Sequence, residues 1–205
     1  MATMRTMFLA SSNKNKIREI SLPLKSMAIN LKSLEDVALE SPDESGKTFE
    51  ENALLKADFG FEKTGLPTIA DDSGFCIESL RGFPGIFSGR FAEKNGGYQR
   101  TMRLLNELLK NENKKSYFIA VIAFIDRNSS GKMEKHIFRG RVDGNFVYPP
   151  RGNNGFGYCP CFMPDGSGIT YGEMDNERRM ESNHRSVALN KFIEFIRKRE
   201  TTNNP

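Results

Sequence analysis

A continuous apolar run in the middle of the chain most constrains the fold. Residues 117–125, YFIAVIAFI, carry no charged side chain and are rich in β-branched and aromatic residues. Such a run is typical of a strand that is buried on both faces. The run therefore predicts a strand in the interior of the protein, covered on both of its faces.

The segments around this run alternate between helical and extended patterns. Thr48 and Glu51 form a capping box, and an apolar stripe at helical spacing continues to Phe61. Further helices are expected at residues 16–26, 98–109 and 187–197. A strand at residues 134–139 should pair back on the apolar run as a hairpin. Helices mixed with strands and one hairpin predict an α/β fold with a mixed sheet.

The length fits a single globular domain. The 205 residues are enough for one domain, or for two lobes that share a core. We expect one domain over residues 1–200 and a polar tail at residues 201–205. No apolar run approaches the roughly 18 residues that a membrane-spanning helix needs, so no membrane partner is expected. The N-terminal residues lack the apolar core of a signal peptide, which predicts a cytoplasmic protein.

Charge and cysteine content argue against further classes. The formal net charge of +4 is mild, and the only dense basic run, residues 197–199, lies at the end of a predicted helix. Nucleic-acid-binding proteins more often carry a basic stripe with interleaved aromatic residues, so no nucleic-acid partner is expected. The three cysteines have no disulfide-framework spacing and should be reduced. Cys159 and Cys161 stand too close in sequence for the usual zinc-binding pair.

Three segments carry groups that could bind one ligand, and the first is SSNKNK, residues 11–16. It lies between a predicted strand and a predicted helix. Backbone N–H groups at a helix start attract anions, and Ser11, Asn13 and Lys16 add hydroxyl, amide and ammonium groups. The segment could hold a polyphosphate, although it lacks the glycines of a Walker loop. An ordinary capped helix is the alternative.

The second segment is ADDSG, residues 70–74, where a strand reaches two adjacent aspartates. Burying either carboxylate without a partner would be costly, so a cation is expected nearby. Mg²⁺ fits, because it takes carboxylate oxygens and completes its shell with water and substrate phosphates. One carboxylate could bind the metal while another orients or deprotonates water. Further candidate ligands are Asp43, Glu44, Glu50 and Glu51. An exposed Asp-Ser turn is the alternative.

The third segment joins GFGYCPCF, residues 155–162, with NHRSVAL, residues 183–189. Phe156 and Tyr158 could stack on a base, and Arg185 offers only hydrogen-bond donors in a fixed fork. The alternatives are core packing for the two rings and a surface position for Arg185. The hypothesis of a nucleotide site therefore depends on all three segments occurring in one chain.

Together these segments resemble the inosine triphosphate pyrophosphatase family. The matching segments run in the family's order: SSNKNK, TFEENALLKA, ADDSG, GFPGIFSGRFA, FRGRVDG, GFGYCPCFMPDG and HRSVAL. The resemblance implies two lobes around a long mixed sheet with a central cleft, and a homodimer. It also implies Mg²⁺-dependent cleavage of non-canonical purine nucleoside triphosphates, such as ITP, dITP and XTP, to the monophosphate and pyrophosphate.

The resemblance also assigns roles by position. The triphosphate would be held by Ser11, Asn13 and Lys16. Ser73 would touch the substrate, and Asp72 would bind the metal and accept a proton. Glu44 would be the second metal ligand, with Glu40 or Asp43 as alternatives. The base pocket would comprise Phe156, Gly157, Tyr158, His184 and Arg185.

The chain departs from the family pattern at three positions. Cys159 stands where the family usually has aspartate, Arg179 where it has lysine, and Asn183 where it has serine. Cys159 and Arg179 remain candidate substrate contacts. A neutral thiol accepts a hydrogen bond from the base N1–H more weakly than a carboxylate does. The phosphate and metal residues match, so the departures bear on base selectivity more than on hydrolysis.

Two rival functions remain open from the sequence. One is a nucleotide-binding module with weakened or lost catalysis, or a pyrophosphatase of shifted base specificity, and the other is a basic RNA-binding domain.

Arg185 would give a pyrophosphatase a physical basis for selecting 6-oxo purines. Its N–H groups can donate to O6, whereas the amino group of adenine would leave a donor facing a donor.

Overall fold

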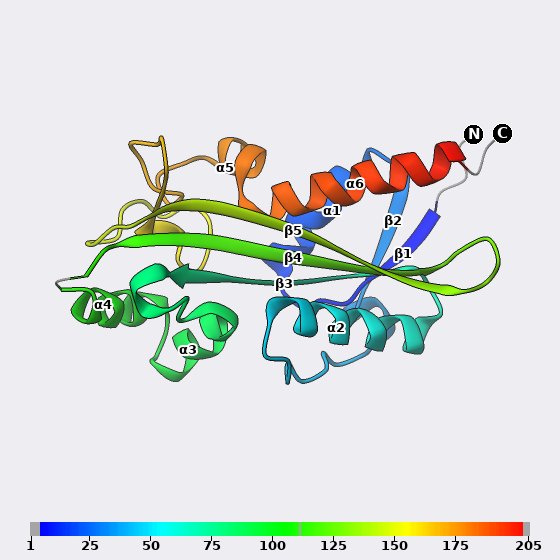
Figure 1. Ribbon diagram of the computed structural model, residues 1–205, viewed down its shortest axis with the longest axis horizontal. Helices are drawn as coiled ribbons and strands as arrows, with labels where there is room; N and C mark the ends of the chain where they lie inside the picture. The colour runs from blue at the N-terminus through cyan, green and yellow to red at the C-terminus, as the bar shows by residue number, and fades with distance from the viewer. Residues whose placement is uncertain (1–4, 111, 203–205) are drawn as a thin grey trace. The chain divides into compact units, whose positions relative to one another are not determined.

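The computed structural model describes residues 5–110 and 112–202, which form six strands and six helices (Figure 1). The strands are β1 (Arg5–Leu9), β2 (Ile29–Ser33), β3 (Thr68–Ile77), β4 (Lys115–Arg127), β5 (Met133–Phe146) and β6 (Phe162–Pro164). The helices are α1 (Lys14–Lys25), α2 (Phe49–Thr64), α3 (Ser88–Lys94), α4 (Tyr98–Leu108), α5 (Asn176–Ser182) and α6 (His184–Thr202). The predicted elements are present, and most are longer than their sequence patterns indicated.

The strands form one mixed sheet in the order β2-β1-β3-β4-β5-β6. β1 pairs in parallel with both β2 and β3, whereas β5 and β6 pair antiparallel. β4 and β5 are neighbours in the sheet, and the turn between them is closed by a hydrogen bond from the Gly131 N–H to the Asn128 carbonyl at 2.9 Å. The predicted α/β fold with a mixed sheet is confirmed.

The chain divides into two compact units. Unit 1 comprises Met1–Asp72, Ala120–Gly140 and Arg185–Pro205, and unit 2 comprises Ser73–Ile119 and Arg141–His184. β3, β4 and β5 each contribute residues to both units. A single domain over residues 1–200 stays a prediction. Of the predicted polar tail, Thr201 and Thr202 belong to α6, and residues 203–205 lie outside the described residues.

Unit 1 has helices on both faces of its strands (Figure 1). On one face, Ile20 of α1 and Phe192 of α6 join Ile69 of β3 in a single buried cluster. On the other face, Gly60 of α2 lies so close to Phe8 of β1 that a Cβ on Gly60 would come within 2.7 Å of the ring. Strands covered on both sides explain why their residues read as continuous apolar runs in the sequence.

Helix α2 begins where the capping box predicts and ends at Gly65. The Thr48 side chain accepts a hydrogen bond from the Glu51 N–H at 3.1 Å, which satisfies one of the free donors of the first turn. Gly65 ends the helix with φ of 65°, a left-handed conformation that glycine adopts without strain. These two signals fix the register of α2, and the register decides which of its side chains face β3.

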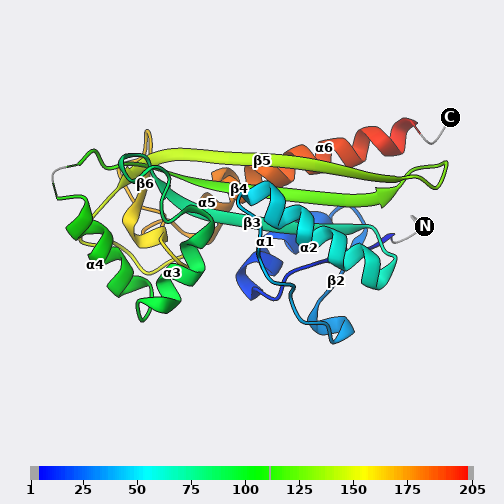
Figure 2. The ribbon, with the colours of Figure 1, turned by 60° about the horizontal axis from the view of Figure 1, so that its bottom comes forward.

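Unit 2 has an aromatic core of its own. Phe75 of β3 lies 5.2 Å from Phe118 of β4 and 5.1 Å from Tyr158, measured between ring centroids. Phe162 of β6 packs edge-on against Phe118 at 4.9 Å. Helices α3 and α4 lie side by side in both ribbon views (Figures 1 and 2). The core therefore gathers aromatic residues from strands and from the glycine-rich segment after Gly155.

Cys76, Cys159 and Cys161 are all buried free thiols, as expected. Across residues 5–110 and 112–202, no helix combines the length and the apolar character that crossing a membrane requires.

Candidate active site

The two adjacent aspartates lie inside β3 and both are buried, so the alternative of an exposed turn is wrong. Asp71 is 1% exposed and Asp72 is 4% exposed. Consecutive side chains of a strand point to opposite faces of the sheet. Asp71 accordingly shares the α1 and α6 face with Ile69, and Asp72 shares the α2 face with Ala70. The strand itself separates the two charges, and each carboxylate has cationic partners of its own.

The first group of partners, the Asp72 cluster, comprises Glu44, Asn52, Lys56 and Asp72. The Nζ atom of Lys56 lies 2.8 Å from Oδ1 of Asp72 and 2.6 Å from Oε1 of Glu44. Nδ2 of Asn52 donates to Asp72 at 3.4 Å, and Oδ1 of Asn52 accepts from the Gly46 N–H at 2.8 Å. Asn52 and Lys56 stand one turn apart on the buried face of α2. Through these two side chains, helix α2 connects the segment that carries Glu44 and Gly46 to β3.

One lysine serves two carboxylates in the Asp72 cluster, and this sets their protonation. Burial raises the pKa of Asp72 to about 6. The negative charge of Glu44 also raises this pKa, whereas Lys56 and Lys16 lower it without outweighing burial. Burial opposes ionisation of Glu44 too, but Lys56 and Lys16 outweigh it and lower the pKa of that carboxyl. Asp72 is therefore the group of this cluster that titrates nearest neutral pH.

The second group, the Asp71 network, comprises Lys16, Glu19, Asp71 and Arg185. Nε and Nη2 of Arg185 donate to the two carboxylate oxygens of Asp71 at 3.1 and 3.4 Å. Nη1 of Arg185 donates to Glu19 at 2.5 Å, and Nζ of Lys16 lies 2.7 Å from Oδ2 of Asp71. Burial opposes ionisation of Asp71, but Arg185 and Lys16 hold its pKa well below the usual range. The network is a chain of alternating charges.

The SSNKNK segment forms a capped helix start. Oδ1 of Asn13 accepts from the backbone N–H of Asn15 at 3.0 Å and of Lys16 at 3.2 Å. The Asn13 N–H donates in turn to Oγ of Ser11 at 3.2 Å. Two of the amides that could hold an anion are thus used by the cap. The Lys16 ammonium, which lowers the pKa of both Asp72 and Glu44, is the cation of this segment that reaches the aspartates.

The donor set of the Asp72 cluster suits a divalent cation. No group of three or more His, Cys, Asp or Glu side chains is placed to hold a metal ion in the part of the chain that the structure describes. Glu44 and Asp72, however, direct one oxygen each at the same Lys56 nitrogen, at 2.6 and 2.8 Å. Two convergent carboxylates are what Mg²⁺ takes from a protein when substrate phosphates and water complete its shell. The residues present therefore fit Mg²⁺.

The other predicted substrate residues, apart from Arg185, lie in unit 2. Ser73 is half-buried at the point where β3 enters this unit, and Phe156 and Gly157 are half-buried in the glycine-rich segment. Tyr158 is buried in the aromatic core, and its hydroxyl donates to the Ser88 carbonyl at 3.0 Å. Core packing of Tyr158, one of the alternatives, is thus what the structure shows.

Cys159 and Arg179 meet around Gly155. A Cβ on Gly155 would come within 2.8 Å of Sγ of Cys159 and 3.2 Å of Nη1 of Arg179, so the two side chains face one small space. Cys159 is 7% exposed and Arg179 is 6% exposed. The ring of His184 stacks on Phe118, with centroids 4.7 Å apart and planes 14° from parallel. Unit 2 therefore brings together two of the positions at which the chain departs from the family pattern.

Sequence reasoning missed three members of the charged groups, namely Glu19, Asn52 and Lys56. All three lie on the buried faces of helices among apolar residues. A polar side chain within an apolar stripe needs a buried partner, and that signal was present in the sequence. The pair Asn52 and Lys56, spaced by four within the stripe of α2, was the clearest instance.

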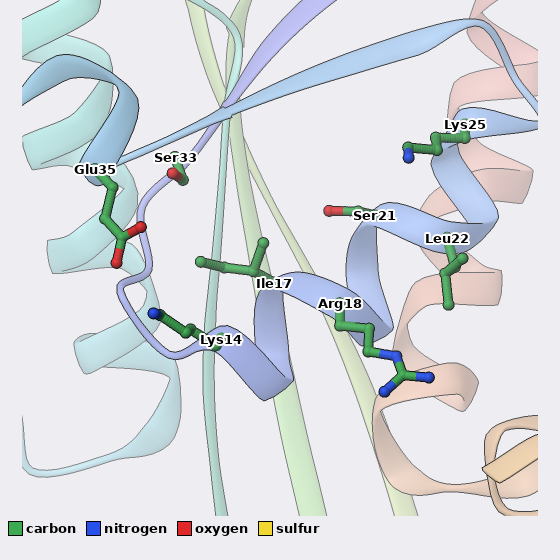
Figure 3. A pocket seen from close by; sticks show the side chains of 8 residues that line it. All are labelled: Lys14, Ile17, Arg18, Ser21, Leu22, Lys25, Ser33 and Glu35. Atoms are coloured by element: carbon green, nitrogen blue, oxygen red, sulfur yellow. The ribbon is translucent and has the colours of Figure 1, made fainter.

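A separate surface pocket lies along the outer side of α1 (Figure 3). It has a volume of about 380 Å³ and is lined by Lys14, Ile17, Arg18, Ser21, Leu22, Lys25, Ser33 and Glu35. Ile17 and Ser21 point from α1 toward the segment that carries Ser33 and Glu35. None of the lining residues belongs to the Asp72 cluster or the Asp71 network. The pocket is a separate feature of the helix that carries Lys16 and Glu19.

Comparisons with known proteins agree with the resemblance seen in the sequence. The model of the Ham1 family matches residues 7–195. A dITP/XTP pyrophosphatase of Deinococcus radiodurans is 39% identical over 185 residues, which cover 90% of each chain. One of Thermus thermophilus is 38% identical over 190 residues, 91% of this chain and 89% of that protein. A HAM1 protein structure from Coxiella burnetii superposes with a TM-score of 0.87 at 32% identity, covering 95% of this chain and all of that one.

Proposed function

This chain belongs to the Ham1 family, and from that premise we propose that it hydrolyses non-canonical purine nucleoside triphosphates to the nucleoside monophosphate and pyrophosphate. ITP, dITP and XTP are the proposed substrates, in keeping with relatives named dITP/XTP pyrophosphatase. One observation carries the proposal from the structure. Glu44 and Asp72 converge on a single cationic position, and the Lys16 ammonium is close enough to affect both carboxyl groups.

We propose Mg²⁺ as the cofactor, held by Glu44 and Asp72. When bound, it would offset the negative charge of the triphosphate and polarise a phosphoryl oxygen. Lys56 would then share its carboxylates with the metal, so its ammonium would turn to a phosphate oxygen as its new partner. Lys16, supported by Asp71, would supply a second ammonium to the phosphates.

Asp72 is the proposed proton acceptor. Without metal, burial raises the pKa of Asp72 to about 6, so its carboxylate is ionised at neutral pH and can accept a proton. Asp72 would take a proton from the water that attacks the α-phosphorus. The new bond joins the water oxygen to that phosphorus, and the bond to the bridging oxygen breaks. Pyrophosphate leaves with the electron pair of that bond.

Recognition of the base is a proposal that rests on the family resemblance. The residues concerned are Phe156, Gly157, Tyr158, Cys159, Arg179, His184 and Arg185. A contact between Arg185 and O6 would have to coexist with the three hydrogen bonds that Arg185 makes to Asp71 and Glu19. The thiol of Cys159 would replace the carboxylate that the family pattern has at this position.

Two further properties are proposed with this activity. The resemblance implies a homodimer, which size-exclusion chromatography with light scattering would test. The N-terminal sequence predicts a cytoplasmic location, which cell fractionation would test. A monomer at the working concentration would refute the first, and recovery outside the cytoplasmic fraction would refute the second.

The proposed activity is tested by identifying the products. Purified protein is mixed with ITP and Mg²⁺, and the phosphorus resonances are followed by NMR. Inosine monophosphate and pyrophosphate should appear together, and chelation of the metal should stop the reaction. Appearance of inosine diphosphate and orthophosphate would refute cleavage between the α- and β-phosphates. Nucleotide binding without turnover would favour the rival, a binding module that has lost catalysis.

A further inference from the structure

Arg185 and Asp71 form the centre of the buried Asp71 network in unit 1. Two nitrogens of the guanidinium face the two oxygens of the carboxylate, at 3.1 and 3.4 Å. Such paired hydrogen bonds fix the orientation of both groups, because the guanidinium fork is planar and rigid. A third nitrogen of Arg185 is held by Glu19 at 2.5 Å. Asp71 is therefore attached to a guanidinium that cannot turn freely.

Exposure changes along the network. The side chains of Asp71 and Arg185 are 0% and 2% exposed, Glu19 is 8% exposed, and Lys16 is 15% exposed. Lys16 therefore has the most exposed side chain of the four. A ligand from solvent can reach Lys16 more easily than the other three members.

Charge balance explains why the buried groups remain ionised. Two cations and two anions alternate, so each carboxylate has at least one cationic neighbour within hydrogen-bonding distance. Removing one member would leave a buried charge unpaired, which is costly. Arg185 is shared by Asp71 and Glu19, so Lys16 completes the charge balance. The contact between Lys16 and Asp71, at 2.7 Å, also fixes where the ammonium lies.

A fixed ammonium favours binding because a lysine side chain is flexible. Ordering a lysine costs conformational entropy, and a ligand that must order it loses affinity. A carboxylate that holds the ammonium beforehand removes the cost from the binding step. We propose that Asp71 is a positioning residue which, fixed by Arg185 and Glu19, holds the Lys16 ammonium in place for the polyphosphate of the substrate. The proposal rests on the proposed function in taking the ligand of Lys16 to be a polyphosphate.

The two adjacent aspartates would then have different roles. Asp72 faces α2, where it contacts Lys56 and Asn52, and it is itself a proposed metal ligand. Asp71 faces α1 and α6, where it contacts Lys16 and Arg185 and would act on the substrate through Lys16. Asp71 and Asp72 would therefore not share one metal ion, although their adjacency in the sequence suggested a shared cation.

Electrostatics and positioning predict opposite signs, which makes the proposal testable. Asp71→Asn removes a negative charge beside an anion site, so a purely electrostatic role predicts tighter binding of polyphosphate. A positioning role predicts weaker binding, because Lys16 is no longer held. The probe is inorganic triphosphate, and its Kd is measured by calorimetry in the presence of a metal chelator. This measurement requires neither Mg²⁺ nor turnover.

We expect Asp71→Asn to weaken triphosphate binding about five- to thirtyfold, the range of one ordered charged contact. In a Lys16→Ala background the same change should alter Kd less than about twofold, because Asp71 acts through Lys16. Equal or tighter binding by Asp71→Asn, or an equal loss in both backgrounds, would overturn the proposal. So would triphosphate binding that does not depend on Lys16.

Two further variants keep the test decisive. Asp126→Asn is the matched control, because Asp126 is 8% exposed in β4 and pairs with Arg5 and Arg199 in unit 1. It should lower the melting temperature without changing the Kd for triphosphate. Glu19→Gln leaves Asp71 and Lys16 intact, and by loosening Arg185 it should weaken triphosphate binding about two- to threefold. If Asp71→Asn does not fold, unchanged binding by Glu19→Gln overturns the proposal.

Failure of the proposed function would look different. Protein that binds triphosphate through Lys16 and Asp71 but hydrolyses no nucleoside triphosphate would refute the enzyme and leave the positioning role standing. Full hydrolysis of ITP together with unchanged triphosphate binding in Asp71→Asn would refute the positioning role alone.

Discussion

The Lys56 ammonium lies 2.8 Å from the Asp72 carboxylate, in the interior of unit 1. The same nitrogen lies 2.6 Å from Glu44, so one cation serves two anions. A carboxylate that shares its paired lysine with a second carboxylate is incompletely neutralised and keeps an affinity for further positive charge. That property suits both a metal ligand and a proton acceptor.

Asp72→Asn should retain the fold and lose most turnover. Asparagine has nearly the size of aspartate and can still accept a hydrogen bond from Lys56, but it cannot take a proton from water. Loss of a general base reduces kcat by roughly 10²–10⁴-fold. The measurement is kcat for ITP by pyrophosphate release, with circular dichroism to verify folding. A folded variant that keeps more than about half of the wild-type rate would refute the role of Asp72.

The same substitution should change how stability depends on pH when metal is absent. Burial raises the pKa of Asp72 to about 6, above the value of about 3.9 for an unfolded aspartate. The folded state then binds the proton more tightly, so this group costs the wild type stability as pH rises from about 4 to about 6. Asparagine does not titrate. The free energy of unfolding of the variant minus that of the wild type should therefore increase, by up to about 3 kcal/mol, as pH rises across this window.

Urea unfolding in the presence of a chelator, at a series of pH values, measures this difference. Above about pH 7 the two curves should run parallel. A difference that stays constant, or that favours the wild type as pH rises, would show that the pKa of Asp72 is not raised.

Lys56→Met should strengthen the binding of Mg²⁺ to the free protein. Removing the ammonium leaves Glu44 and Asp72 facing each other without a cation, so a divalent ion meets less competition. We expect roughly tenfold tighter Mg²⁺ binding, together with reduced turnover because a phosphate partner is lost. Calorimetric titration with Mg²⁺ measures the affinity. Lys63→Met, on the exposed side of α2, is the control and should leave the affinity unchanged. Weaker binding by Lys56→Met would contradict the proposed metal position.

The sequence predicted the fold well where a local pattern is compatible with only one kind of secondary structure. The apolar run at residues 117–125 predicted a buried strand, and β4 extends it at both ends. The capping pair Thr48 and Glu51 located the start of α2. Such features are local, and burial or hydrogen bonding of neighbouring groups accounts for them.

The charged groups were harder to predict, because they depend on which face of β3 each side chain occupies. Adjacent aspartates suggested one shared cation, and the structure gives Asp71 and Asp72 separate partners. Lys56 and Arg185 come from helices 16 residues before and 113 residues after Asp72, distances that no local pattern spans. The polar residues within apolar helical stripes were the usable signal.

Cys159→Asp should sharpen selection against adenine. A carboxylate could accept from the N1–H of hypoxanthine or xanthine and would repel the bare N1 of adenine. The new charge would have Arg179 as a neighbour across Gly155, so the substitution has a cation to balance it. The ratio of kcat/KM for ITP over ATP should rise about tenfold, the effect of one charge-assisted hydrogen bond.

The wild type, with its thiol, should show measurable activity on GTP, because guanine shares O6 and N1–H with hypoxanthine. Cys161→Ala is the control, since it removes a neighbouring buried thiol that donates to the Tyr158 carbonyl. Ratios for ITP, XTP, GTP and ATP that are the same in the wild type and Cys159→Asp would place Cys159 away from the base.

The central claim is that this protein is a pyrophosphatase that prefers 6-oxo purine nucleoside triphosphates. The most direct measurement is kcat/KM of the wild type for ITP and for ATP, with Mg²⁺ and pyrophosphate release as the readout. We predict that ITP exceeds ATP by at least about tenfold, with inosine monophosphate as the second product. Equal values for the two nucleotides, or no pyrophosphate from either, would contradict the claim.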